Sequence, residues 1–297
     1  MRASREKVRL AARAKVNLRL EVLAREASGY HQLETVFCAL DFADDVEIDI
    51  GDPGLTLEID GAELPTGPDN LVYRAAHAFF ERASIEPCAA IRLKKRIPAG
   101  AGLGGGSSDA AVTLRGLNLL LHQPLEHQAL LELAINIGSD VPFFLCGSSL
   151  ALAWGRGERL LPLEPLPAID VVIIAPPFAI VTANAYRALA AQRDTVTPRL
   201  TPHITPLHRL AGWDTVFADA HNDFQAIATQ MHPALHDYIS ALEAAGAGVA
   251  MLSGSGSAVF GLFKDTRVAS RAAKRLRTRF PEAKVVETRT AVSGSPR

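Results

Sequence analysis

The sequence predicts an α+β protein of two domains. Its 297 residues are about twice the length of a typical domain, so two domains or one large domain are expected. Hydrophobic residues form 48% of the chain and charged residues 21%, a globular composition that excludes a disordered, collagenous or coiled-coil chain. Segments with strand and helix periodicity both occur, and each half carries one Gly/Ser-rich loop, near residues 100 and 254.

The first third of the chain is expected to be rich in β-structure. Strands in which apolar and polar side chains alternate are expected over residues 8–22, 46–50, 55–59 and 91–97, and the last of these should be half-buried. A helix is expected over 71–82, where apolar residues recur at helical spacing after a cap at Asp69 or Asn70. The first Gly/Ser-rich loop then opens a helix over 110–121, capped by Ser108 or Asp109, and a further helix follows over 125–137.

The boundary between the domains is expected near residue 163, because Leu160–Ala168 contains three prolines. We assign residues 1–163 to an N-terminal domain, 164–290 to a C-terminal α+β domain and 291–297 to a flexible tail. The second half is expected to hold a buried strand over 171–174, helices over 183–192, 233–245 and 264–279, and a hairpin of 249–252 with 258–263. The Lys264–Arg279 helix should expose a solvated cationic face, and His203 and His208 lack metal-ligand spacing.

Charge and cysteine content narrow the class of protein. With 31 Lys and Arg against 32 Asp and Glu, the net charge of −1 gives no global field for nucleic acid or anionic lipid. Cys38, Cys88 and Cys146 have no metal-binding or disulfide pattern and are expected to be reduced thiols. The first 15 residues lack a signal sequence, and the longest apolar stretch is interrupted by Pro176 and Pro177. A soluble, cytoplasmic protein that contacts neither nucleic acid nor membrane is expected, as a monomer or a homodimer.

The strongest chemical signal is the loop Pro98–Asp109, which has five glycines in the seven residues from 100 to 106. Glycine adopts positive φ freely and lets backbone N–H groups approach one anion, to which a helix N-terminus adds its dipole. A polyphosphate is therefore the expected ligand. A flexible linker is the competing interpretation, but linkers do not usually join a strand to an apolar helix without a polar spacer.

Other phosphate-loop patterns fit poorly. Gly100, Gly102 and Gly105 satisfy G-x-G-x-x-G, but the preceding strand is half polar and no acidic residue follows at the dinucleotide-binding spacing. No Lys-Ser or Lys-Thr follows the glycines, which excludes the Walker pattern, and the H-R-D and D-F-G signatures of protein kinases are missing from the sequence.

Three separated motifs follow one another along the chain: Ala14–Leu18, the glycine loop Pro98–Ser108 and Met251–Ala258. In sequence and in order they resemble the motifs of the family of small-molecule kinases that act on galactose, homoserine, mevalonate and phosphomevalonate. Further segments resemble the branch of this family that phosphorylates a cytidine diphosphate-linked methylerythritol in isoprenoid precursor synthesis: Gly29–Thr35, Asn70–Leu71, Gly138–Phe144 and Asn222–Gln225. Ser28 stands where the family usually has Asp. Gln225 stands where the family has Glu, so we assign the segment Asn222–Gln225 no catalytic role. The resemblance implies two domains with the active site in the cleft between them.

Asp140 and Lys15 are the candidate catalytic residues. Asp140 is an isolated carboxylate among apolar residues, a setting in which a nearby cation is favourable. The residues next to Lys15 in the sequence are not acidic, so Lys15 is expected to pair with a carboxylate distant in the sequence, and Asp140 is the candidate. From the residues alone, a structural ion pair or a helix cap is an equal alternative. The resemblance implies that Asp140 takes the proton of the acceptor hydroxyl, while Lys15 lowers the pKa of that hydroxyl or steadies the transferring phosphoryl group.

The remaining candidate residues fall into a nucleotide set and an acceptor set. ATP, with Mg²⁺, is expected on the glycine loop: Pro98, Ala99, Gly100, Ala101, Gly102, Leu103, Gly104, Gly105, Gly106, Ser107 and Ser108. Ser107 and Ser108 are candidates for phosphate or metal contact, although Ser108 also suits a helix cap. The resemblance places Asn70 and Lys95 on the nucleoside side of ATP, whereas Lys94–Arg96 also suits a solvated strand face.

For the acceptor, a cytosine ring calls for an aromatic group to stack and a polar group to recognise its edge. The candidates are Tyr30, His31, Asn17, Thr182 and Tyr186. The loop Ser253–Ser257 either closes over the acceptor's diphosphate or forms a simple hairpin turn. Two alternatives remain: another kinase of the same family, and a catalytically silent relative that only binds ligand, against which the intact Lys15, Asp140 and glycine loop argue.

Overall fold

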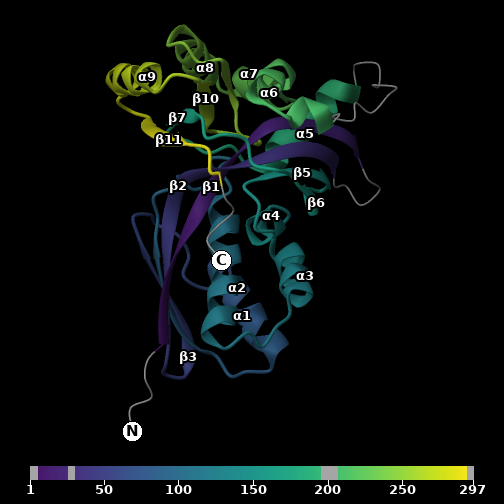
Figure 1. Ribbon diagram of the computed structural model, residues 1–297, viewed down its shortest axis with the longest axis vertical. Coiled ribbons are helices and arrows are strands. Elements are labelled where there is room, and N and C mark those ends of the chain that lie inside the picture. The colour runs from purple at the N-terminus through teal and green to yellow at the C-terminus, as the bar shows by residue number, and fades with distance from the viewer. Residues whose placement is uncertain (1–5, 26–30, 195–206, 293–297) are drawn as a thin grey trace.

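The computed structural model describes residues 6–25, 31–194 and 207–292 and contains two β-sheets, each covered by helices (Figure 1). The first half of the chain forms β1 (Glu6–Arg25), β2 (His31–Ile50), β3 (Gly54–Asp60), α1 (Leu71–Ala83), β4 (Cys88–Lys94), α2 (Gly105–Leu120), α3 (His127–Ile137), α4 (Val141–Leu145), β5 (Leu150–Gly155) and β6 (Arg159–Pro162). The second half forms β7 (Asp170–Ala175), α5 (Thr182–Asp194), a 3-10 turn (Leu207–Leu210), α6 (Trp213–Asp219), β8 (His221–Asn222), α7 (Gln225–Met231), α8 (Ala234–Ala244), β9 (Val249–Leu252), β10 (Val259–Phe263), α9 (Thr266–Arg279) and β11 (Lys284–Arg289).

The long antiparallel pair of β1 and β2 links the two halves of the molecule, and both strands arch across the middle of Figure 1. Each strand has 20 residues. The first sheet has the order β3-β4-β2-β1-β8, with β5 and β6 extending from β2. The strand expected over 46–50 is therefore only the end of a strand that begins at His31. That long strand was missed because residues 33–40 are buried without interruption and show no alternation.

Two irregularities in the pairing of β1 with β2 bracket the segment that contains Lys15 and Asn17. The register shifts between Arg13 and Lys15 and again between Asn17 and Arg19. β-bulges of this kind change the direction in which side chains point and are frequent beside active sites. Lys15 and Asn17 are two residues apart on the strand, so both side chains leave the same face of the sheet.

Both faces of β1 are buried over its middle, residues 14–22. Val16 and Leu18 pack into a core between the two sheets, together with Val171 and Phe260 of the second sheet. The polar residues on the opposite face are also almost fully covered: Lys15, Asn17, Arg19 and Glu21. The alternation was recognised correctly, but its polar side faces the interior of the protein.

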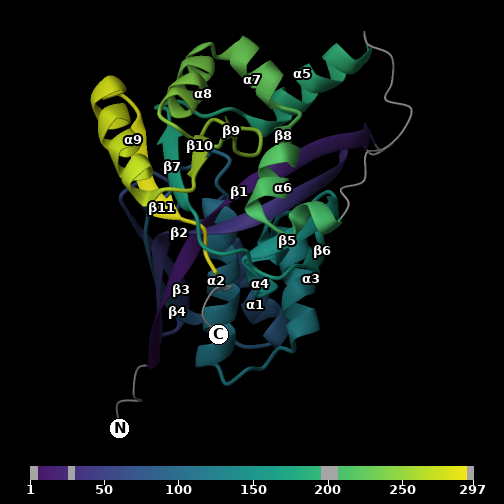
Figure 2. The ribbon, with the colours of Figure 1, turned by 45° about the horizontal axis from the view of Figure 1, so that its top comes forward.

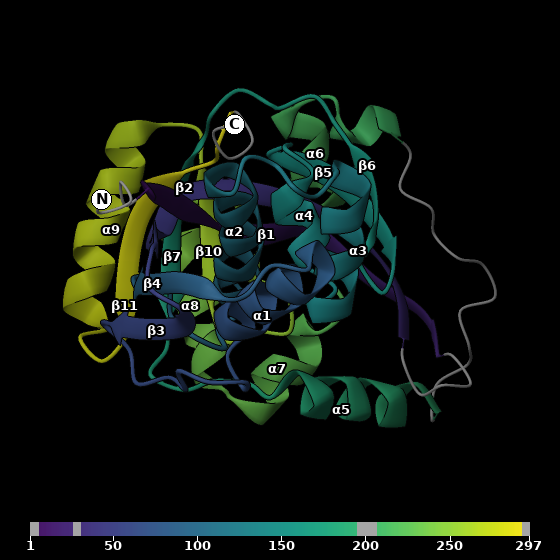
Figure 3. The ribbon, with the colours of Figure 1, turned by 90° about the horizontal axis from the view of Figure 1, so that it is seen from below.

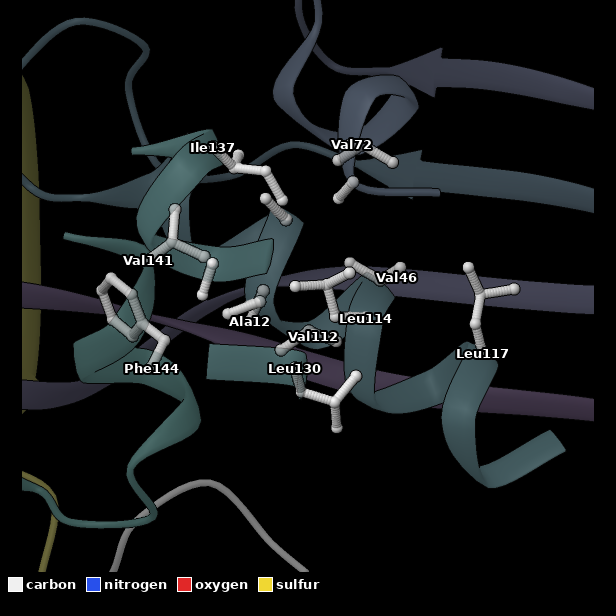
Figure 4. Packing of buried hydrophobic residues seen from close by; sticks show 14 of the residues in the cluster. Ala12, Val46, Val72, Val112, Leu114, Leu117, Leu130, Ile137, Val141 and Phe144 are labelled. Atoms are coloured by element: carbon white, nitrogen blue, oxygen red, sulfur yellow. The ribbon is translucent and has the colours of Figure 1, made fainter. Parts of the chain in front are cut away.

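Helices α1 to α4 cover one face of the first sheet, as Figure 3 shows from below. The apolar side chains of α2 are central to this packing, and Leu114 and Leu117 lie among Ala12, Val46 and Leu130 in Figure 4. The helices expected over 71–82 and 125–137 are present as α1 and α3. Asn70 caps α1 as expected, because its Oδ1 accepts a hydrogen bond of 2.8 Å from the N–H of Val72.

Helix α2 begins earlier than predicted. Its first residue is Gly105 and its cap is Gly104, whose φ of 69° is left-handed. Neither Ser108 nor Asp109 is the cap, since the N–H of Ser108 already donates to the carbonyl of Gly104 at 2.9 Å. The prediction was wrong because the cap rule looks for a side-chain oxygen, whereas here the chain turns into the helix through a glycine.

The second sheet has the order β11-β7-β10-β9 and is covered on its outer side by α7, α8 and α9 (Figure 2). β9 and β10 form the antiparallel pair expected for 249–252 and 258–263. Helix α9 buries Ala269, Ala272 and Leu276 and leaves its Arg and Lys side chains exposed, as expected. The insert 195–206, including His203, lies outside the described residues.

The boundary near residue 163 stays a prediction; in the structure, β6 ends at Pro162 and β7 begins at Asp170. The second half also contributes β8, which pairs in parallel with Arg19 and Leu20 of β1. Ala291, expected to open a flexible tail, is instead buried and its N–H donates to the carbonyl of Ala39 at 2.8 Å. All three cysteines are free. Among the residues described, no helix has the length and apolar character needed to cross a membrane.

Candidate active site

The two glycine loops lie against each other. The Ser253 hydroxyl donates to the carbonyl of Gly102 at 3.0 Å, and the N–H of Ala258 donates to the carbonyl of Ala101 at 3.0 Å. Gly102 has a φ of +78°, and a Cβ there would lie only 2.1 Å from the carbonyl oxygen of Ser253. Only glycine fits this approach, so the loop near 100 is a built structure and not a flexible linker.

The first glycine loop also lies directly against β1. The N–H of Lys15 donates to the carbonyl of Leu103 at 2.9 Å. A Cβ on Gly104 would lie 2.9 Å from Cγ of Lys15 and 3.0 Å from Cζ of Phe144. The loop therefore leads the chain past the Lys15 side chain and into α2, whose first amides have no acceptor within the helix.

A buried hydrogen-bonded chain starts at Lys15. Its ammonium lies 3.4 Å from Oδ2 of Asp140 and donates to Oδ1 of Asn17 at 2.8 Å. The Asn17 amide donates in turn to the Thr35 hydroxyl at 2.7 Å, and that hydroxyl donates to the carbonyl of Arg19. The ammonium also lies 5.2 Å from the centre of the Phe37 ring. Every donor in this chain has a defined partner, so the Lys15 ammonium has a fixed position.

Asp140 is the more accessible member of the pair, with 29% of its side chain exposed against 4% for Lys15. It occupies the cap position of α4, but its side chain makes no capping hydrogen bond. Of the two alternatives to a catalytic role, the helix cap is thus wrong, and the ion pair with Lys15 is present. A carboxylate that is open to solvent on one side and paired with a cation on the other is suited to receive a proton from a bound hydroxyl.

A cavity of about 1160 Å³ extends to Ser139, the neighbour of Asp140, and is lined by His31, Thr182 and Tyr186. The rings of His31 and Tyr186 stack with their centres 4.8 Å apart. Burial raises the pKa of Tyr186 to about 12, and the negative charge of Asp140 adds to this rise. The Tyr186 hydroxyl therefore stays protonated and uncharged, and the ring lines the cavity close enough to Asp140 for the carboxylate charge to act on it.

The structure brings together most of the residues expected to bind the acceptor. His31, Thr182 and Tyr186 line the cavity. Asn17 is connected to Asp140 through Lys15, whose ammonium donates a hydrogen bond to Asn17 and pairs with Asp140. The Thr182 hydroxyl lies 3.0 Å from the Ser255 hydroxyl, which connects α5 to the second glycine loop. Tyr30 lies outside the described residues.

On the expected nucleotide side, Asn70 and Lys95 both have defined partners within the protein. Asn70 uses its side chain to cap α1 and donates to the carbonyl of Pro65 at 2.8 Å. Lys95 is buried, so the interpretation of Lys94–Arg96 as a solvated strand face is wrong at its central residue. Its ammonium donates to Oδ2 of Asp109 at 2.7 Å and to Asp44. Contact of either residue with a nucleotide stays a prediction.

Sequence reasoning missed two groups of residues near the site. Four arginines line the cavity from three different parts of the chain, and nothing in their local sequence marks them: Arg74, Arg156, Arg159 and Arg187. The Asn222 amide holds the second glycine loop by donating to the carbonyls of Leu252 and Gly254, at 2.9 and 2.8 Å. The matched segment Asn222–Gln225 was a usable signal for this anchoring role.

Within the described ranges, no three His, Cys, Asp or Glu side chains gather as a ready-made metal site. Hard oxygen donors are nevertheless present at the start of α2. The Ser108 hydroxyl is buried and has no hydrogen-bond partner, and Ser107 precedes it. Mg²⁺ is usually held by one or two protein oxygens together with phosphate oxygens and water, and this donor set fits that habit.

Two domain families and a set of named enzymes are similar to this chain in sequence. The GHMP kinases N terminal domain matches residues 70–148, and the GHMP kinases C terminal domain matches residues 207–282. A 4-diphosphocytidyl-2-C-methyl-D-erythritol kinase of Pelotomaculum thermopropionicum is 39% identical over 282 residues, which cover 94% of this chain and 96% of the relative. The enzyme of the same name from Solibacter usitatus is 41% identical over 265 residues, covering 89% of this chain and 83% of the relative.

Solved structures are similar over the whole fold. A crystal structure of 4-(cytidine 5'-diphospho)-2C-methyl-D-erythritol kinase has a TM-score of 0.81 and 35% identity, covering 96% of this chain and 99% of its own. A homoserine kinase from Cytophaga hutchinsonii has a TM-score of 0.71 at 20% identity, with coverage of 99% and 97%. The second similarity shows the fold alone, and it agrees with the two-domain α+β expectation.

Proposed function

The chain belongs to the GHMP kinases, among the 4-diphosphocytidyl-2-C-methyl-D-erythritol kinases, and from this premise we propose how its residues transfer the phosphoryl group. It is an ATP-dependent kinase of the non-mevalonate isoprenoid pathway, with 4-diphosphocytidyl-2-C-methyl-D-erythritol as its acceptor. The proposed site of phosphorylation is the 2-hydroxyl of the methylerythritol. We also propose a cytoplasmic enzyme, monomeric or homodimeric, that needs neither membrane nor nucleic acid, which its net charge of −1 supports.

Asp140 is the proposed general base. Its carboxylate takes the proton of the acceptor hydroxyl as the hydroxyl oxygen bonds to the γ-phosphorus of ATP, while the bond between that phosphorus and the β,γ-bridging oxygen breaks. ADP leaves with the electron pair of the broken bond. The ammonium of Lys15, 3.4 Å from Asp140, stabilises negative charge on the attacking oxygen and on the transferring group.

The glycine loop Pro98–Ser108 is the proposed site of the ATP phosphates. Its support is the geometry of an N-terminal helix turn whose amides lack helical partners, reached through the left-handed Gly104. Ser107 and Ser108 are the proposed protein ligands of Mg²⁺. When bound, the metal supplies positive charge that offsets the phosphates.

The acceptor is proposed to lie in the cavity beside Asp140. The stacked rings of His31 and Tyr186 offer a flat aromatic surface for the cytosine, and Thr182 lies at the second glycine loop. Four arginines and one carboxylate, Glu158, line the same cavity, which gives it net positive charge suited to a diphosphate; the arginines are Arg74, Arg156, Arg159 and Arg187. Tyr30, next to His31, is kept as a proposed contact.

One observation carries this proposal: a fixed Lys15–Asp140 pair lies between the glycine loop and an aromatic cavity. The test is ADP release with ATP and Mg²⁺ over a panel of acceptors. The cytidine diphosphate-linked methylerythritol should be turned over, and mevalonate, homoserine and galactose should not. Turnover of mevalonate without turnover of the cytidine diphosphate-linked acceptor would refute the proposal.

A further inference from the structure

A buried cluster of three charged residues lies behind the first glycine loop and has no part in the chemistry proposed above. Lys95, Asp44 and Asp109 have exposed fractions of 7%, 0% and 1%. One ammonium and two carboxylates are more costly to bury than apolar side chains of the same size. The geometry of the cluster therefore calls for an explanation other than filling the core.

The Asp44 carboxylate holds the strand end of the loop. Asp44 lies on β2, and its Oδ1 accepts hydrogen bonds from the N–H groups of Arg96 and Ile97, the second at 2.8 Å. These two residues immediately precede Pro98, the first residue of the loop. A further hydrogen bond holds the main chain just before the loop: the N–H of Lys95 donates to the carbonyl of Asp60 at 2.8 Å.

The Lys95 ammonium joins this end of the loop to the other. It donates to Oδ2 of Asp44 and, at 2.7 Å, to Oδ2 of Asp109 on α2, the helix that follows the loop. It also lies directly beneath the first residue of that helix, because a Cβ on Gly105 would be 3.2 Å from Nζ of Lys95. A single side chain thus sets the spacing between the two ends of the loop.

We propose that Lys95, with Asp44 and Asp109, is a positioning element for the nucleotide: it fixes the two ends of the glycine loop and so aims the amides at the start of α2. This inference rests on the proposed binding of ATP to that loop. The three residues act from behind the loop, through its backbone, and need not touch the nucleotide. Loss of the link should weaken nucleotide binding and leave the acceptor cavity unchanged.

The test compares two substitutions at Asp109. Asp109→Leu cuts the link to α2 but leaves Lys95 paired with Asp44, so no buried charge loses all its partners. Asp109→Asn keeps an oxygen that accepts from Lys95. Calorimetric titration with ADP should show affinity at least tenfold weaker for Asp109→Leu and within threefold of wild type for Asp109→Asn. The acceptor KM should change less than twofold in both.

A stability control separates positioning from general destabilisation. Leu117→Ala removes a fully buried side chain further along α2 and should lower Tm without changing ADP affinity. ADP affinity equal to wild type in folded Asp109→Leu would overturn the inference. If Asp109→Leu does not fold, Asp44→Asn decides in its place, since it leaves one acceptor oxygen for three donors, and unchanged ADP affinity in that variant overturns the inference equally. A wild-type enzyme that binds ADP but phosphorylates no acceptor would refute the proposed function and not this inference.

Discussion

The ammonium of Lys15 lies 3.4 Å from the Asp140 carboxylate, although the two residues come from a strand and from a short helix far apart in the chain. The Lys15 ammonium is held by Asn17 as well as by Asp140, and the Lys15 N–H donates to the carbonyl of Leu103. The pair therefore combines a cation that is held in place with a carboxylate that is partly exposed to solvent.

Replacing Asp140 by Asn should lower kcat by about 100-fold or more, the usual contribution of a general base, while ADP affinity stays at the wild-type value. The amide keeps the shape of the side chain but cannot accept the proton. Steady-state ADP release and ADP titration measure the two quantities. Asp214→Asn, at an exposed carboxylate paired with Lys264, is the matched control and should retain wild-type turnover. A kcat near wild type for Asp140→Asn would remove this residue from the mechanism.

His31→Ala should raise the KM of the acceptor without a matching change in the KM of ATP. Loss of a stacking partner costs about 1–3 kcal/mol, which corresponds to roughly five- to 150-fold in affinity. His77→Ala is the matched control, because His77 also stacks on a tyrosine, Tyr73, with ring centres 6.4 Å apart, but does not line the cavity. An unchanged acceptor KM in His31→Ala would argue against the proposed cytosine site.

Gly102→Ala should separate the two glycine loops. The new Cβ would lie 2.1 Å from the carbonyl oxygen of Ser253, and φ is +78°, so both overpacking and backbone strain oppose it. We expect kcat/KM for ATP to fall at least tenfold and Tm to fall with it. Gly67→Ala, where no atom lies within 4 Å of the new Cβ, should match wild type in both. Wild-type activity and Tm in Gly102→Ala would mean that the loops need no contact.

Asp109→Asn should flatten the dependence of stability on pH. Burial raises the pKa of Asp109 from 3.8 to about 7; the Lys95 charge opposes this rise and the Asp44 charge adds to it. Because the folded protein holds this proton more tightly than the unfolded chain does, the wild type loses stability as pH rises from about 4 to about 7.

The measurement is the free energy of unfolding by urea at pH values from 4 to 8, for the wild type and Asp109→Asn. The difference between the two proteins should change steadily in favour of the variant up to about pH 7 and then level off. Glu63→Gln, at an exposed position, should follow the wild type throughout. A constant difference between the wild type and Asp109→Asn would show that Asp109 does not titrate in this range.

Local patterns in the sequence predicted much of the fold. The hairpin of β9 and β10, the capped helix α1 and the glycine loop each depend on neighbouring residues, and periodicity and turn chemistry reveal such elements directly. The proximity of Lys15 and Asp140 was inferred from their chemistry, since an isolated carboxylate in an apolar segment needs a cation.

Long-range burial could not be predicted in the same way. Lys95 stands between Lys94 and Arg96, and three successive cations look like a solvated strand face. The two buried carboxylates that pair with Lys95, Asp44 and Asp109, are distant from it in the sequence, so the local pattern does not reveal them. A side chain's pairing with a remote partner leaves no periodic mark in its own segment.

The contacts of the first glycine loop also bear on how the protein is made in the cell. The loop is joined to β1 through Lys15 and Leu103, and to the chain just before β10 through Ala258 and Ala101. During synthesis, residues 98–106 leave the ribosome long before Ala258 does. A nascent chain that stops before residue 258 therefore lacks the hydrogen bond from Ala258 to Ala101, so the two glycine loops come together only after this part of the second half has been made.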